Sequence, residues 1–253
     1  DTKKYWAYAK ESAKANMKAH VSNSYLYWIW WFLDPLLFMI IYSFVSLIVF
    51  DRDQEYLTAF IFIGLSCWNF FQKTIKCSVT LLQKNKGLIS KIYIPKFVLI
   101  YTVMIEESIK MAISFSLVVC TIFIYNIKPT INIIYIVFIL LALYLFTFGC
   151  STILMHFGAF VQDLENIINA LLRLVFYVSG VFYSIDRIPD PYKNVLLHFN
   201  PLAMIMHDMR ECILYGRSIE LINVLGCILI GLVFSIIGVW IIYINENNYV
   251  KVM

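Results

Sequence analysis

The sequence predicts an all-α membrane protein that crosses the bilayer as six helices. Hydrophobic residues make up 61% of the 253 residues and charged residues 14%, whereas a soluble domain has about half and about a quarter, respectively. Apolar stretches long enough for a hydrocarbon core about 30 Å thick recur along the chain. Basic residues are concentrated in particular connections between these stretches, which is typical of a multi-pass membrane protein.

Six apolar stretches meet the requirement of about 20 residues for a membrane-spanning helix. We expect these spans at residues 28–50, 57–75, 97–125, 133–155, 167–183 and 221–244. Together they leave no room for a soluble catalytic domain. The sequence 1–253 is therefore expected to form a single transmembrane domain.

The distribution of lysines predicts that both termini lie in the cytoplasm. Five lysines precede the first span, and the turn between the first two spans contains Arg52 as its single basic residue. Six more lysines follow: Lys73, Lys76, Lys84, Lys86, Lys91 and Lys96. Short segments rich in Lys and Arg stay in the cytoplasm, and an even number of spans returns the C-terminus to the same side.

The first 25 residues are expected to lie on the membrane surface as an amphipathic helix. The two faces of this helix carry Lys10, Lys14 and Lys18 on one side and Trp6, Ala9, Ala13 and Met17 on the other. A basic, weakly hydrophobic helix of this kind binds the headgroup region of an anionic bilayer.

Residues 184–218, here called the outer segment, separate the fifth and sixth spans. This segment mixes prolines and charges with apolar residues, so it is too apolar for a solvated loop and too interrupted to span. Irregular backbone at membrane depth requires protein cover or a water-filled path. We therefore expect a re-entrant or half-inserted pair of helices on the outer side.

Charged residues inside the predicted spans are candidates for function. Asp34 precedes Pro35, which is expected to kink the first span because it lacks a backbone donor. Asp34 is expected either to contact a polar substrate or hold a gate, or to form a buried ion pair with a cation on another span, such as Lys110 or Arg173.

The carboxylates of the third span have a cation close by. Glu106 and Glu107 lie four and three residues before Lys110, so local pairing is expected. Such pairing argues against a proton-coupled transporter, which needs lone carboxylates along its path.

Small residues in the sixth span indicate close helix packing. Gly231, Ser235 and Gly238 recur at helical spacing. They predict a close approach to another helix, either within the chain or across a dimer.

The chain has no sequence signature of a nucleotide-binding, catalytic or metal site. G-x-x-x-x-G-K-[ST], H-E-x-x-H and G-x-S-x-G are absent, and none of the six cysteines forms a C-x-x-C pair. The four histidines are scattered through different segments, so we expect no metal site and no cofactor in this chain. The lysines lie beside spans, where anionic lipid accounts for them, so nucleic acid is not an expected partner.

Two explanations of the abundant aromatic residues remain open. Interfacial anchoring accounts for most of them, and a subset is expected to line a path for sugars, which stack on aromatic faces. The candidate path residues are Trp30, Trp31, Asp34, Tyr42, Trp68, Phe70, Phe176 and Tyr177.

Several stretches taken together resemble the permease subunits of ABC-2 type polysaccharide exporters, which include O-antigen, teichoic-acid and capsule exporters. They are residues 30–37, 64–71, 85–96 and 162–167, then Asn200-Pro201-Leu202 followed by Arg210 and Tyr215-Gly216. One position departs from the family pattern, because Gln162 stands where many members carry arginine before Asp163.

The resemblance implies a multi-pass protein of the cytoplasmic (inner) membrane that exports a lipid-linked glycan. It implies a homodimer of permeases docked on two copies of a cytosolic ABC ATPase, which binds the ATP and magnesium, so this chain is not expected to be an enzyme. Residues 82–95, here called the coupling region, would contact the ATPase, with a short helix over residues 85–94. Its candidate contacts are Asn85, Lys86, Gly87, Leu88, Ile89, Lys91 and Tyr93. The candidate outer gate consists of Pro189, Asn200, Pro201 and Arg210.

Three alternative functions remain. An ABC-2 exporter of another amphiphile, such as a lipid or drug, would share the fold. An integral membrane enzyme that modifies glycans, such as an acyl- or glycosyltransferase, would need a cluster of His, Asp or Glu at one membrane face. A secondary transporter would usually carry internal repeats and broken midplane helices.

Overall fold

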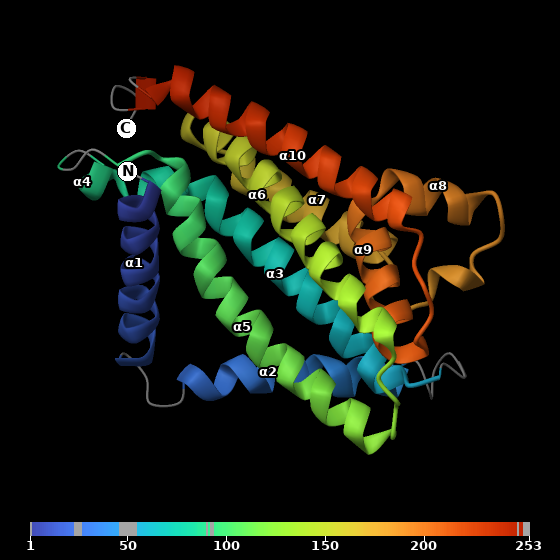
Figure 1. Ribbon diagram of the computed structural model, residues 1–253. Helices are drawn as coiled ribbons and strands as arrows, with labels where there is room; N and C mark the ends of the chain where they lie inside the picture. Colours follow the sequence, from blue (N-terminus) through green and yellow to red (C-terminus); the bar gives the residue numbers. More distant parts are fainter. Residues whose placement is uncertain are drawn as a thin grey trace.

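The computed structural model describes residues 2–22, 27–45, 55–89, 91, 94–246 and 248–249. Over these residues the chain is helical and contains no strand (Figure 1). The elements are α1 (Thr2–Ser22), α2 (Tyr27–Phe44), α3 (Leu57–Lys84), α4 (Lys86–Ile89), α5 (Phe97–Ile124), the 3₁₀ turn η2 (Ile131–Tyr135), α6 (Ile136–Phe160), α7 (Leu164–Val178), the 3₁₀ turn η3 (Ile185–Arg187), α8 (Tyr192–Phe199), α9 (Pro201–Arg210), the π-helical turn η4 (Glu211–Tyr215) and α10 (Leu221–Ile244).

Each predicted span coincides with one helix, although several ends differ. α10 has the predicted bounds, whereas α3 continues to Lys84 because Val79, Leu81 and Leu82 of its last turns are buried in the bundle. α7 ends at Val178 because the chain turns at Gly180, which has a φ of 67°. α2 continues through Pro35, and residues 46–50 of the predicted span lie outside the described residues.

Three of the described helices combine the length and apolar composition needed to cross a bilayer. They are α5, the continuous run Ile131–Phe160, and α10, and α2 adds a shorter apolar helix, Ile29–Phe44. α3 is long enough, but Asn69, Gln72 and Lys73 interrupt its apolar sequence. These polar residues require an environment inside the bundle.

α3 is the central helix of the bundle and packs against α2, α5, α6, α7 and α9. Figure 1 shows α3, α5, α6 and α10 running side by side. α4, the start of α1 and the end of α10 lie at one end of this bundle, and α8 lies at the opposite end. The arrangement therefore separates the coupling region from the outer segment by the length of the bundle.

α6 and α10 approach each other closely along most of their length. A Cβ on Gly231 would lie 2.7 Å from the backbone nitrogen of Phe146, and one on Gly149 would lie 2.6 Å from the Cβ of Phe234. Ser235 Oγ donates hydrogen bonds to the Gly231 carbonyl at 2.7 Å and the Leu145 carbonyl at 3.2 Å. The small residues predicted to allow close packing therefore act within the chain.

α1 has the two predicted faces with one exception. Ala9 and Ala13 are buried and α1 packs against α5, while Lys10 and Lys14 are exposed. Trp6 was predicted on the same face as Ala9 and Ala13, but unlike them its side chain is 58% exposed. The alanines allow the backbone of α1 to approach α5, and the larger indole lies beside this contact.

The outer segment is a pair of helices, as predicted. α8 and α9 are joined through Asn200, whose backbone φ of −114° and ψ of 94° break the helical path between them. The Asn200 side chain accepts hydrogen bonds from the N–H groups of Leu202 and Ala203, both at 3.2 Å, and so caps α9. Pro201 occupies the first turn of α9, where its missing N–H costs nothing.

Candidate functional site

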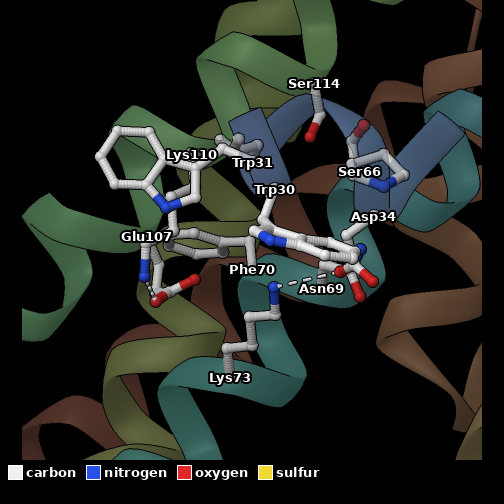
Figure 2. Close-up of a pocket in the computed structure, with 12 residues that line it drawn as sticks. Trp30, Trp31, Asp34, Ser66, Asn69, Phe70, Lys73, Glu107, Lys110 and Ser114 are labelled. Carbon is white, nitrogen blue, oxygen red and sulfur yellow. Dashed lines mark hydrogen bonds and ion pairs between the residues drawn. The ribbon is translucent and has the colours of Figure 1, made fainter. Parts of the chain in front are cut away.

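A cavity of about 270 Å³ opens between α2, α3 and α5 (Figure 2). We call it the Trp30 cavity. Its lining residues are Trp30, Trp31, Asp34 and Pro35 from α2, Ser66, Asn69, Phe70 and Lys73 from α3, and Glu107, Lys110, Met111 and Ser114 from α5. The cavity brings together half of the residues predicted to form a sugar path.

The polar residues of the cavity form one stripe on each of two otherwise apolar helices. Ser66, Asn69 and Lys73 recur at spacings of three and four residues, which places them on one face of α3. Glu107, Lys110 and Ser114 follow the same spacing in α5. Glu107 and Lys110 of this span were singled out from the sequence, but Ser114 was not. The periodicity of the polar residues within an apolar helix was the signal that could have found the rest.

Asp34 pairs with a cation of another predicted span, as one of the two alternatives expected, but this cation is Lys73 and not Lys110 or Arg173, and the pair is not buried. The distance from Asp34 Oδ2 to Lys73 Nζ is 3.7 Å, with the two side chains 43% and 44% exposed. Lys110 instead donates to Glu107 Oε1 at 2.6 Å, as predicted for this local pair, and Arg173 lies on the exposed face of α7. The Asp34–Lys73 pair therefore remains accessible from the cavity.

Glu106, the neighbour of Glu107, has a partner outside its own helix. Its Oε1 atom accepts a hydrogen bond of 2.8 Å from Asn16 Nδ2 on α1. This contact fixes α1 against α5 beside the Trp30 cavity.

The chemistry of the Trp30 cavity suits a hydroxyl-rich ligand without net charge. The carboxylates of Asp34 and Glu107 balance the ammonium groups of Lys73 and Lys110 among the lining residues. Charged side chains, an amide and hydroxyls offer donors and acceptors, and the indole rings offer apolar faces.

The remaining candidate path residues belong to an aromatic cluster that joins α2, α3 and the end of α7. The Tyr42 and Phe182 rings stack at 4.1 Å, and Phe176 lies 4.7 Å from Phe182 and 5.2 Å from Trp68. Trp68 is 2% exposed, so it is a packing residue here. Tyr177, in contrast, is 64% exposed on α7.

Arg210 fastens the outer segment to the bundle. Its Nε, Nη1 and Nη2 atoms donate to the carbonyls of Phe60 at 3.2 Å, Gly180 at 2.8 Å and Val181 at 2.7 Å. The guanidinium also lies 3.5 Å from the centre of the Phe60 ring. Arg210 is 2% exposed, and a side chain at Gly64 would collide with it.

Asn200 makes a second attachment at the same turn. Its Nδ2 atom donates to Ser179 Oγ at 2.9 Å, next to the Gly180 carbonyl that Arg210 holds. Of the four predicted gate residues, Asn200, Pro201 and Arg210 therefore position α9. Pro189 lies in the exposed connection before α8.

A charged cluster in the outer segment was not predicted. His207 lies between two carboxylates, with Nε2 3.4 Å from Asp186 Oδ2 and Nδ1 3.2 Å from Asp208 Oδ1. One ligand atom each from Asp186, His207 and Glu211 lies within 4.8 Å of the others, a set that divalent cations accept. Lys193 Nζ is 2.7 Å from Asp186 Oδ1 and competes for this carboxylate. The scattered histidines gave no hint of this cluster, because its members come from different elements.

The ionisation of the cluster follows from these contacts. Burial lowers the pKa of His207, but the hydrogen bond to Asp208 and the charges of Asp186 and Glu211 outweigh it, so the pKa lies above 6.5. Burial raises the pKa of Asp186, but Lys193 and His207 outweigh it and the pKa lies below 3.8. Both shifts favour the charged forms.

Within its described residues, the coupling region is less helical than predicted. Residues 82–84 belong to α3, and α4 contains only Lys86–Ile89. Asn85 ends α3, because its Nδ2 atom donates to the Leu81 carbonyl at 2.8 Å. The predicted contact Tyr93 lies outside the described residues.

The described part of the coupling region has a packed side and an open side. Leu88 and Ile89 are half-buried and pack against the core. Lys86, Gly87 and Lys91 are exposed, and nothing lies within 4 Å of a Cβ built on Gly87. Such a surface offers two ammonium groups and close backbone access to a partner.

Comparison with known proteins places this arrangement in a family. The profile of the ABC-2 type transporter family matches residues 9–214. The chain therefore belongs to this family, and it is a membrane-embedded transporter subunit.

Curated relatives are O-antigen export system permease proteins. One named RfbA, from Klebsiella pneumoniae, is 26% identical over 236 residues, which cover 92% of this chain and 89% of the relative. Another protein named RfbA, from Myxococcus xanthus, is 26% identical over 191 residues, covering 75% and 74% of the two chains.

Replacement of Arg210 by lysine is expected to lower the stability of the protein although it keeps the positive charge. An ammonium group does not reproduce the planar set of donors that reaches three carbonyls. Each buried carbonyl left without a donor costs about 1–3 kcal/mol, so the apparent Tm in detergent should fall by about 4–8 °C. Arg217→Lys, at a side chain 69% exposed, should change Tm by no more than about 2 °C. An unchanged Tm for Arg210→Lys would contradict the assigned contacts.

Proposed function

We propose that this chain is the permease subunit of an ATP-driven exporter that moves a lipid-linked polysaccharide from the cytosolic side across the cell membrane. The observation that carries the proposal is the similarity over 92% of the chain to an O-antigen export permease. Family membership favours transport over a glycan-modifying enzyme. An ABC-2 exporter of a lipid or drug would share the fold, and the chemistry of the Trp30 cavity favours a glycan.

The Trp30 cavity supports a sugar contact on the translocation route. Its lining combines indole rings with balanced charges and hydroxyls, which suits neutral sugar units. Its volume of about 270 Å³ lies just below the range of roughly 300–1,000 Å³ for small-molecule pockets. In this proposal the cavity holds one part of a longer glycan at a time.

The arrangement of the elements supports a topology with six spans and both termini in the cytoplasm. The start of α1, α4 and the end of α10 share one end of the bundle (Figure 1). The exposed residues Lys84, Lys86 and Lys91 lie in or beside the coupling region, and short basic segments stay inside. The opposite end, with α8, faces outward in this topology, and α9 and Arg210 act at the exit. We assign the protein to the cytoplasmic (inner) membrane.

A separate ABC ATPase is the proposed source of energy. The coupling region offers Lys86, Gly87 and Lys91 on its open side, so the ATPase would seat there and bind ATP and magnesium itself. Two permeases and two ATPases would form the complex. The exposed apolar residues of α7, which include Ile167, Leu171 and Leu174, support a homodimer because a second copy would cover them.

One prediction of the proposed function concerns sugar binding. Trp30→Ala should weaken the apparent affinity of the reconstituted complex for its lipid-linked glycan by about two- to tenfold, because an aromatic contact contributes roughly 0.5–1.5 kcal/mol. Trp30→Phe should retain most of the affinity. The measurement is glycan-stimulated ATP hydrolysis at increasing glycan concentration. Trp240→Ala, at an indole that is 62% exposed on α10, is the control. An equal loss of glycan affinity in Trp30→Ala and Trp240→Ala would contradict a role of the Trp30 cavity in glycan binding.

Another prediction of the proposed function concerns the coupling of the permease to the ATPase. Deletion of residues 86–91 should abolish export while membrane insertion remains, because the spans are untouched and the ATPase loses its contact. Export is measured as glycan accessible outside proteoliposomes, and insertion by protease protection. Retained export in the deletion variant would reject the coupling role.

A further inference from the structure

The chain continues past α10 into a short turn that folds back onto the bundle. This turn, here called the C-terminal hook, consists of Asn245, Glu246, Asn248 and Tyr249. The N–H groups of Asn248 and Tyr249 donate to the Asn245 carbonyl at 3.0 and 3.3 Å. The Tyr249 side chain is fully buried. A fully buried aromatic ring in this turn marks a fixed attachment of the hook to the bundle.

Tyr249 attaches the hook to α6. Its hydroxyl lies 2.8 Å from His156 Nδ1, and its ring packs against His156 and Phe160 with centroids 5.9 Å from each. α6 and α10 already approach each other closely at Gly149 and Gly231. The attachment of the hook to α6 therefore adds to a rigid pair of helices.

Glu246 attaches the same hook to the end of the coupling region. Its Oε1 atom accepts a hydrogen bond of 2.8 Å from Lys96 Nζ, and the side chains are 18% and 5% exposed. Lys96 directly follows the coupling region and directly precedes α5. A charge-assisted bond with this burial is shorter and stronger than a solvated pair.

The coupling region has covalent connections to α3 and α5 only. A force applied at Lys86 or Lys91 therefore reaches those two helices along the chain, whereas α10 is distant in sequence. The ion pair between Lys96 and Glu246 bridges 150 residues of sequence separation. It is a direct polar link from this region to the α6–α10 pair.

We propose that the Lys96–Glu246 ion pair transmits displacement of the coupling region to the α6–α10 pair, so that ATP hydrolysis moves these helices together with α5. Lys96 and Glu246 are positioning residues for transport in this account. The inference rests on the proposed function, in which the coupling region receives the ATPase.

The test separates hydrolysis from transport. Wild type, Lys96→Gln, Glu246→Gln and the exchanged pair Lys96→Glu with Glu246→Lys are each reconstituted as the full complex with the ATPase. Asn248→Ala is the matched control, because this residue belongs to the hook and its exposed side chain donates a hydrogen bond to Asn245 Oδ1 within the hook itself. The readout is the amount of glycan exported per ATP hydrolysed.

Each single variant is expected to keep its ATPase activity within about twofold while export per ATP falls about tenfold, a size typical of coupling between two sites. The exchanged pair should recover most of the wild-type ratio, and Asn248→Ala should equal wild type. A wild-type ratio in both single variants overturns the inference, and so does a failure of the exchanged pair to recover export.

The assembly of each complex and the export by the wild-type complex are the two controls of this test. Size-exclusion chromatography establishes that each complex is assembled, and if the single variants do not assemble, the exchanged pair decides alone. An assembled exchanged pair that hydrolyses ATP without export overturns the inference, and one that exports supports it. Absence of export by the wild-type complex would instead reject the proposed function, whatever the hook variants do.

Discussion

The outer half of this molecule depends on the contact between Arg210 and the central helix α3. The guanidinium occupies the space left by Gly64 and donates to carbonyls on α3 and on the turn after α7. A buried charge is expensive unless its donors are satisfied, so these three partners keep α9, α3 and the turn at Gly180 in one arrangement. Asn200, which caps α9 and holds Ser179, reinforces it.

The same physical requirement shapes the rest of the bundle. Lys73 and Asp34 face each other across the Trp30 cavity, Lys110 pairs with Glu107, and Lys96 pairs with Glu246 near the coupling region. The exposed Asp34–Lys73 pair contributes little to stability, and its accessibility leaves it available to a polar ligand. The buried Lys96–Glu246 pair instead fixes two segments that are far apart in the sequence. The exposed pair is therefore open to a ligand, whereas the buried Lys96–Glu246 pair has a connecting role.

The sequence predicted most of the helices but only part of the site. Each apolar run coincides with a helix, and the bounds of α10 were correct because its apolar and helical ends coincide. The second span was predicted to be shorter than α3, because the apolar sequence is interrupted at Lys73 whereas the helix continues beyond it. Trp30, Trp31, Asp34 and Phe70 were found by residue type, whereas the partner of Asp34 was not, because the register between helices is set by tertiary packing. The contacts of Arg210 were also hidden, since backbone carbonyls have no sequence signature.

The central claim is that a cytosolic ATPase acts on this chain through the coupling region. The side of the membrane on which the coupling region lies tests it most directly, because a cytosolic ATPase can act only on a cytosolic surface. Single cysteines replace the exposed residues Lys91 and Arg187 in a chain whose native cysteines have been removed. Right-side-out membrane vesicles are then treated with a membrane-impermeant maleimide. The account predicts labelling of Arg187→Cys in sealed vesicles and of Lys91→Cys only after permeabilisation. Labelling of Lys91→Cys in sealed vesicles would contradict it.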